Sequence, residues 1–111
     1  MIDVNAVSEV ISTYRRYGWV LRRILLKRIE DGSSLAASID LGDAKIATSA
    51  INAAWFSRPP KAGPVAWEIR YLGNIPFALL ETLEENGSDF EYLLSKTEAR
   101  LLEAISAKEA S

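Results

Sequence analysis

The sequence predicts one α+β domain, with an N-terminal helix, an antiparallel sheet of about four strands around a central hairpin, and a C-terminal amphipathic helix. Apolar residues recur at helical spacing near both ends of the chain and alternate with polar residues in its middle. Of the 111 residues, 49% are apolar and 25% are charged, which is the balance of a globular protein. Residues 1–111 are therefore expected to form a single domain, whose last residues, 107–111, fray.

The N-terminal helix is predicted over residues 3–17, where apolar side chains follow one helical face. Asp3 is a suitable N-cap for this helix. Arg15 and Arg16 suit the negative end of the helix dipole. Gly18 follows at the position where a left-handed residue often ends a helix.

The segment 19–28 is open to two interpretations. A continuous helix would include Gly18, at a cost of roughly 1 kcal/mol. It would also set Trp19 on an exposed basic face, of the kind that binds membrane surfaces or anions. The strand that Gly18 favours instead places Arg22 and Arg23 on opposite faces, because side chains alternate along a strand.

The next part of the chain carries weaker signals. An Asp-Gly pair at 31–32 is typical of a turn, which would lead into a second strand with the sequence LAASIDL. Residues 40–50 are ambiguous, and either Asp43 or Ser49 would cap a short helical turn there. The proline-rich and glycine-rich run RPPKAGP then has the composition of a connecting loop.

A hairpin is predicted around the Gly-Asn pair at 73–74, because VAWEIRYL before it alternates between apolar and polar residues. Closing the hairpin at this pair sets Trp67 opposite Leu80. The competing interpretation is a helix over residues 76–86, which are rich in helix formers.

The predicted pairing divides the hairpin into two faces. The first face is apolar and is expected to lie against the core: Val65, Trp67, Ile69, Tyr71, Ala78 and Leu80. The second face mixes charged with apolar residues: Glu68, Arg70, Glu81, Leu72, Phe77 and Leu79. An apolar patch of this kind is usually covered by a helix or by another subunit.

The C-terminal helix is predicted to begin with a capping box after Gly87, with Ser88 as N-cap and Glu91 at the third helical position. Its apolar stripe continues to about residue 106. Residues 1–30 hold six bases and three acids, whereas residues 81–111 hold three bases and eight acids. We therefore expect the two ends of the chain to lie near each other, or to pair across a dimer.

The composition excludes several classes of function. The chain has neither cysteine nor histidine, which removes Ser-His-Asp triads, thiolate nucleophiles and the usual zinc and iron sites. No metal, cofactor or catalytic residue is therefore expected. The net charge of −2 argues against nucleic acid as a partner, and the strand interpretation of 19–28 argues against a membrane. Without a signal peptide or cysteines, a cytoplasmic location is expected.

The candidate ligand-binding residues are arginines and aromatic residues. Two arginines in an apolar run need an anionic partner if they are buried, either an acid of the C-terminal helix or a carboxylate or phosphate ligand. Arginines and aromatic rings near the hairpin can together hold an anionic or aromatic molecule. The set comprises Arg22, Arg23, Arg58, Arg70, Trp55, Trp67 and Tyr71.

Two functions follow as hypotheses. The first is a non-enzymatic protein-interaction module that self-associates as a homodimer, because two helices do not easily cover both faces of a sheet and no catalytic motif is found. The second is a binding domain, or a histidine-free enzyme, for a small anionic or aromatic ligand.

Overall fold

The computed structural model describes residues 2–60 and 62–110, which form three helices and five strands. The elements in chain order are α1 (Val4–Arg16), β1 (Val20–Leu26), α2 (Asp31–Ser38), β2 (Lys45–Thr48), β3 (Ala53–Arg58), β4 (Val65–Tyr71), β5 (Ala78–Leu83) and α3 (Phe90–Ala110). The predicted α+β class is confirmed. The predicted sheet is corrected in two ways, since it has five strands and includes one parallel pair.

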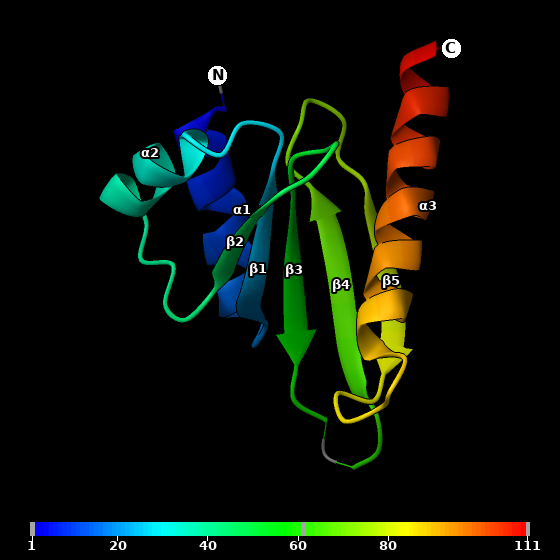
Figure 1. The fold of residues 1–111 in the computed structure, drawn as a ribbon. Coiled ribbons are helices and arrows are strands. Elements are labelled where there is room, and N and C mark those ends of the chain that lie inside the picture. The colour runs from blue at the N-terminus through cyan, green and yellow to red at the C-terminus, as the bar shows by residue number, and fades with distance from the viewer. Residues whose placement is uncertain (1, 61, 111) are drawn as a thin grey trace.

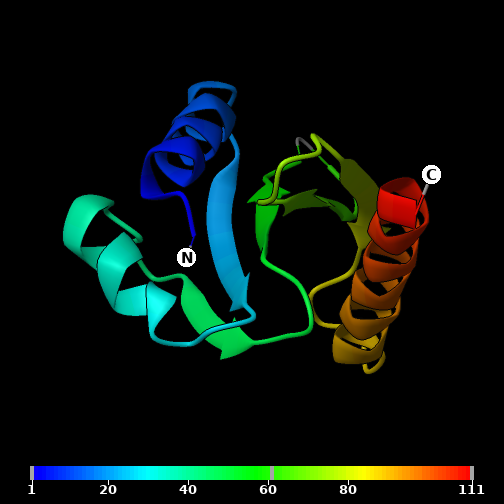
Figure 2. The ribbon, with the colours of Figure 1, turned by 90° about the horizontal axis from the view of Figure 1, so that it is seen from above.

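The strands form one sheet in the order β2-β1-β3-β4-β5, in which only β1 and β2 are parallel among the described strands. Helices α1 and α2 lie on one side of this sheet, and α3 lies on the other side, over β4 and β5 (Figures 1 and 2). Each half of the sheet is therefore covered by helices on one face. No helix in the described part of the chain is long and apolar enough to cross a membrane.

Two hydrophobic clusters result from the alternation of side chains along the strands. The first lies under α1 and α2 and includes Ile24, Leu26 and Phe56. The second lies under α3 and includes Trp55 and Trp67, which are 0% and 1% exposed. Burial of side chains of this size contributes most of the stability that a small domain has.

The two predictions for residues 31–50 are wrong. The Asp-Gly pair at 31–32 opens helix α2 rather than a turn into a second strand, and residues 45–48 form strand β2 rather than a helical turn. The physical reason is the parallel pairing of β1 with β2, because parallel neighbours need a crossover connection and α2 supplies it. Leu35 of α2 is fully buried in the first cluster, and an added Cβ at Gly32 would lie 3.3 Å from Ile46.

The segment 19–28 contains strand β1, and the helix before it ends as predicted. Asp3 accepts a hydrogen bond from the backbone N–H of Ala6 at 3.1 Å, and Gly18 has a φ of +88°. The predicted separation of Arg22 and Arg23 onto opposite faces is wrong. The pairing of β1 with β3 shifts register between Leu21 and Arg23, as at a β-bulge, so that both arginine side chains turn toward the α3 side.

The hairpin of β4 and β5 is confirmed, but its predicted register is wrong by one residue, since Trp67 pairs with Glu81 and Glu68 pairs with Leu80. A two-residue hairpin turn needs positive φ at its first central residue, and Gly73 does not have it. The chain instead makes a longer loop, closed by a 2.9 Å hydrogen bond from the N–H of Tyr71 to the carbonyl of Phe77.

The shifted register exchanges the two faces of β5, because alternate side chains point to opposite sides. Leu79, Glu81 and Leu83 join Trp67 under α3, whereas Ala78 and Leu80 lie on the open face with Glu68 and Arg70. Glu81 is therefore separated from the charged pair that it was expected to join. It accepts hydrogen bonds from Arg100 at 2.7 Å and from Thr97 at 3.3 Å instead.

Helix α3 begins and ends later than predicted. Its first backbone hydrogen bond joins the N–H of Leu93 to the carbonyl of Asp89 at 2.9 Å, which makes the predicted cap at Ser88 wrong. The helix continues to Ala110, beyond the predicted end near residue 106. Fraying of 107–111 stays a prediction, and residue 111 lies outside the described residues.

Candidate anion-binding groove

A groove of about 780 Å³ lies beside strand β1, between the end of α1, the start of β2 and the first residue of α3. Rings of Trp19, Trp67 and Phe90 contribute to its walls, and Asp43 is its acidic lining residue. Four basic side chains also line it: Arg15, Arg22, Arg23 and Lys45. The groove therefore concentrates positive charge in a chain whose net charge is −2.

Arg22 is held in the groove by three neighbours. Its Nη1 donates hydrogen bonds to Ser57 Oγ at 3.1 Å and to Glu85 Oε1 at 3.2 Å. Its guanidinium carbon lies 4.9 Å from the ring centroid of Trp67, within the range of a cation–π interaction. Ser57 is buried, so the position of Arg22 is determined by the sheet beneath it.

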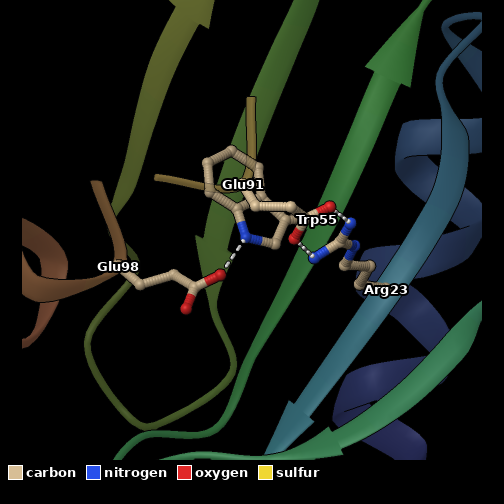
Figure 3. Close-up of polar contacts among 4 residues, drawn as sticks. All are labelled: Arg23, Trp55, Glu91 and Glu98. Atoms are coloured by element: carbon tan, nitrogen blue, oxygen red, sulfur yellow. Dashed lines mark hydrogen bonds and ion pairs between the residues drawn. The ribbon is translucent and has the colours of Figure 1, made fainter. Parts of the chain in front are cut away.

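Arg23 makes a two-pronged ion pair with Glu91, a residue of the first turn of α3 (Figure 3). Arg23 Nη1 donates to Glu91 Oε1 at 2.9 Å, and Arg23 Nη2 donates to Glu91 Oε2 at 2.6 Å. The bonded guanidinium of Arg23, together with the positive charges of Arg23 and Lys45, lowers the pKa of the Glu91 carboxyl. The predicted pairing of the basic and acidic ends of the chain is confirmed by this contact and by Arg22–Glu85.

Arg15 and Lys45 differ from the two paired arginines. Neither makes an ion pair with any residue that the structure describes. Lys45 is the first residue of β2, and the parallel register places it directly beside Arg23. Two adjacent cations, one paired and one unpaired, give the groove capacity for a further negative charge.

The indole N–H of Trp67 is buried without a hydrogen-bond partner among the described residues. Trp55 shows the usual arrangement, since its Nε1 donates to Glu98 Oε2 at 2.8 Å (Figure 3). A buried donor left unpaired costs about 1–3 kcal/mol, so such groups usually have a protein, water or ligand partner. Trp67 also lines the groove, but its Nε1 is buried and is not exposed to a ligand there.

The seven predicted site residues are not brought together. Arg22, Arg23 and Trp67 line the groove, whereas Trp55 is fully buried in the second cluster. The remaining three, Arg58, Arg70 and Tyr71, are elsewhere. Arg58 lies 5.9 Å from the ring centroid of Trp19, Arg70 Nε donates to the carbonyl of Tyr71 at 3.1 Å, and the Tyr71 hydroxyl donates to Glu109 at 3.3 Å.

Sequence reasoning missed Arg15, Lys45 and Phe90 as groove residues. Arg15 was explained by the helix dipole, and Lys45 fell in a segment whose structure was ambiguous. The parallel pairing that sets Lys45 beside Arg23 joins residues distant in the chain, so no local pattern indicates it.

Within the described residues, no group of three or more acidic, histidine or cysteine side chains is placed to hold a metal ion. Comparison of the chain with protein-family models, with curated proteins and with solved structures finds no match. The function is therefore argued from the geometry of the groove.

Proposed function

We propose that this protein is a non-enzymatic binding domain for a small anion, which it holds in the groove beside β1. The observation that carries the proposal is the charge of the lining, in which Arg15 and Lys45 have no ion pair in the described structure and lie with two arginines whose acid partners come from outside the lining. Such a lining attracts anions, and the effect is strongest in a concave site with apolar walls. The aromatic walls favour a ligand with a flat apolar body.

Titration with benzoate and with inorganic phosphate, followed by tryptophan fluorescence, tests this proposal. Lys45→Ala removes an exposed cation without an ion pair in the described structure, so it is expected to leave folding intact. It should raise the dissociation constant of the bound anion roughly twofold to fivefold, the effect of losing one partly screened charge. Arg70→Ala, on the opposite face of the sheet, is the control and should leave binding unchanged.

Two results would overturn the proposal. One is that neither benzoate nor phosphate binds the wild-type protein at millimolar concentrations. The other is that Lys45→Ala and Arg70→Ala weaken binding equally, since binding would then not depend on the groove.

We propose self-association as a second function, because the two edges of the sheet differ. Edge strand β2 has four residues and begins with Lys45, a charge that discourages pairing at an exposed edge. Edge strand β5 has six residues, none of them proline or a basic residue, and its Leu80 is 61% exposed. A second copy that pairs with β5 would extend the sheet and set a neighbouring strand beside Leu80. We also propose a cytoplasmic location, because the chain contains no cysteine and therefore no disulfide.

A further inference from the structure

We propose that the groove recognises an aromatic carboxylate, whose carboxylate takes the place of Glu91 on the guanidinium of Arg23. The inference rests on the proposed anion-binding function and adds the class of ligand and the step by which it binds. Glu91 is the carboxylate of the chain itself that binds this guanidinium.

The burial of the two partners is unequal, and this inequality decides which of them is replaceable. The side chain of Arg23 is 23% exposed, whereas that of Glu91 is 70% exposed. A partly buried guanidinium favours an anionic partner, because an unpaired charge that is partly withdrawn from water is costly. An exposed carboxylate that leaves the pair returns to water at little cost.

The contact between Arg23 and Glu91 shows the coordination that the site provides. Both terminal nitrogens of Arg23 donate, one to each oxygen of the carboxylate, at 2.9 and 2.6 Å. This fork matches a planar carboxylate, and a ligand carboxylate can reproduce both bonds. Lys45 lies beside Arg23 in the register of β1 and β2. It makes no ion pair in the described structure, so its positive charge is available to a ligand carboxylate.

Aromatic rings adjoin the fork. The ring of Phe90 lies 6.0 Å from the guanidinium carbon of Arg23, and the rings of Phe90 and Trp67 pack edge to face at 5.1 Å. A carboxylate attached directly to a flat ring would place that ring against Phe90, because Trp67 is only 1% exposed.

Arg22 and Glu85 provide an internal comparison. Their side chains are almost equally exposed, at 40% and 38%, and a single contact of 3.2 Å joins them. Arg22 also donates to buried Ser57, so it keeps a partner when Glu85 is removed. Glu85→Gln removes one acid near the groove but does not release a guanidinium from a bidentate contact. It is therefore the matched control for Glu91→Gln.

Calorimetric titration of wild type, Glu91→Gln and Glu85→Gln with benzoate and with inorganic phosphate tests the inference. Glu91→Gln should bind benzoate roughly twofold to fivefold more tightly than wild type, because the competing carboxylate is gone. Glu85→Gln should leave the affinity for benzoate close to that of wild type. In wild type, benzoate should also shift the NMR signal of the Glu91 side-chain carboxyl toward that of a free carboxylate.

The outcomes separate this inference from the proposed function. If wild type and Glu91→Gln bind benzoate equally, displacement of Glu91 is wrong while anion binding stands. If Glu91→Gln strengthens the binding of phosphate but not of benzoate, the carboxylate class is wrong. If neither protein binds either anion, the anion-binding function itself fails.

Discussion

Tyr14 links helix α1 to the sheet through both its ring and its hydroxyl. Its ring stacks on Phe56 with centroids 4.1 Å apart and planes 13° apart, and its hydroxyl donates a hydrogen bond to Glu68. Burial, followed by the bond to the Glu68 carboxylate and by its charge, raises the pKa of Tyr14 well above its ordinary value of 10.0. Helix α1 is thereby joined to the open face of β4, where Glu68 lies.

Tyr14 is therefore expected to ionise only at the alkaline extreme in the folded protein. Its pKa is raised by folding, so the stability it contributes is complete below a pH of about 10 and is lost as the pH rises above that value. An alkaline titration of tyrosinate absorbance, compared between wild type and Tyr14→Phe, measures this. The variant should lose absorbance change only at the highest pH, and a loss centred near pH 10 would contradict the structure.

The paired arginines show how far single residues could be predicted. Charge counts along the chain correctly indicated that bases near the start meet acids near the end, as Arg23 meets Glu91. They could not indicate that both arginines turn to one side, because the register shift between Leu21 and Arg23 depends on how β1 fits against β3. The basic lining of the groove follows from that local irregularity.

Among the elements, those with strong local signals were predicted and those that depend on distant partners were not. Helix α1 has its cap at Asp3 and its terminator at Gly18, both readable from the sequence. Helix α2 is short, and it is fixed by burial of Leu35 and by the need to connect parallel strands. The register of β5 depends on the length of the loop at Gly73. One residue more in this loop shifts the pairing of β5 with β4 by one position.

Two adjacent leucines of helix α3 allow a test of how this helix packs in the second hydrophobic cluster. Leu101 is 0% exposed against the sheet, whereas Leu102 is 36% exposed. Leu101→Ala should lower the free energy of unfolding by about 2–5 kcal/mol, because it removes buried apolar area and leaves a cavity. Leu102→Ala is the control and should cost less than about 1 kcal/mol. Urea denaturation measures both, and equal losses would mean that α3 does not pack as described.

At the scale of the whole molecule, helices and sheet are offset. Helices α1 and α2 cover one face near β1 and β2, and α3 covers the other face near β4 and β5 (Figure 2). Two sheet surfaces stay open on opposite sides, one beside the basic groove and one along the outer edge at β5. The sequence predicted that two helices would leave apolar sheet area uncovered, but which strands stay open follows from the strand order.

Strand β5 forms an outer edge of the sheet, where a second copy of the chain is expected to pair. A lysine at position 80 would place a charge on the open face of an edge strand, where natural proteins use lysine to prevent pairing. If β5 pairs with β5 of a second copy, the wild-type protein should elute at twice the 12.3 kDa of one chain. Leu80→Lys should shift the protein toward the monomer under the same conditions.

The matched control is Ile29→Lys, because Ile29 is 50% exposed and lies between β1 and α2, far from β5 in the strand order. Size-exclusion chromatography with light scattering at micromolar concentrations separates the cases. Dissociation by Leu80→Lys alone supports pairing through β5, since only that variant alters the edge. A strictly monomeric wild type, or equal effects of both lysines, contradicts it, because exposed apolar area in general rather than the β5 edge would then govern association.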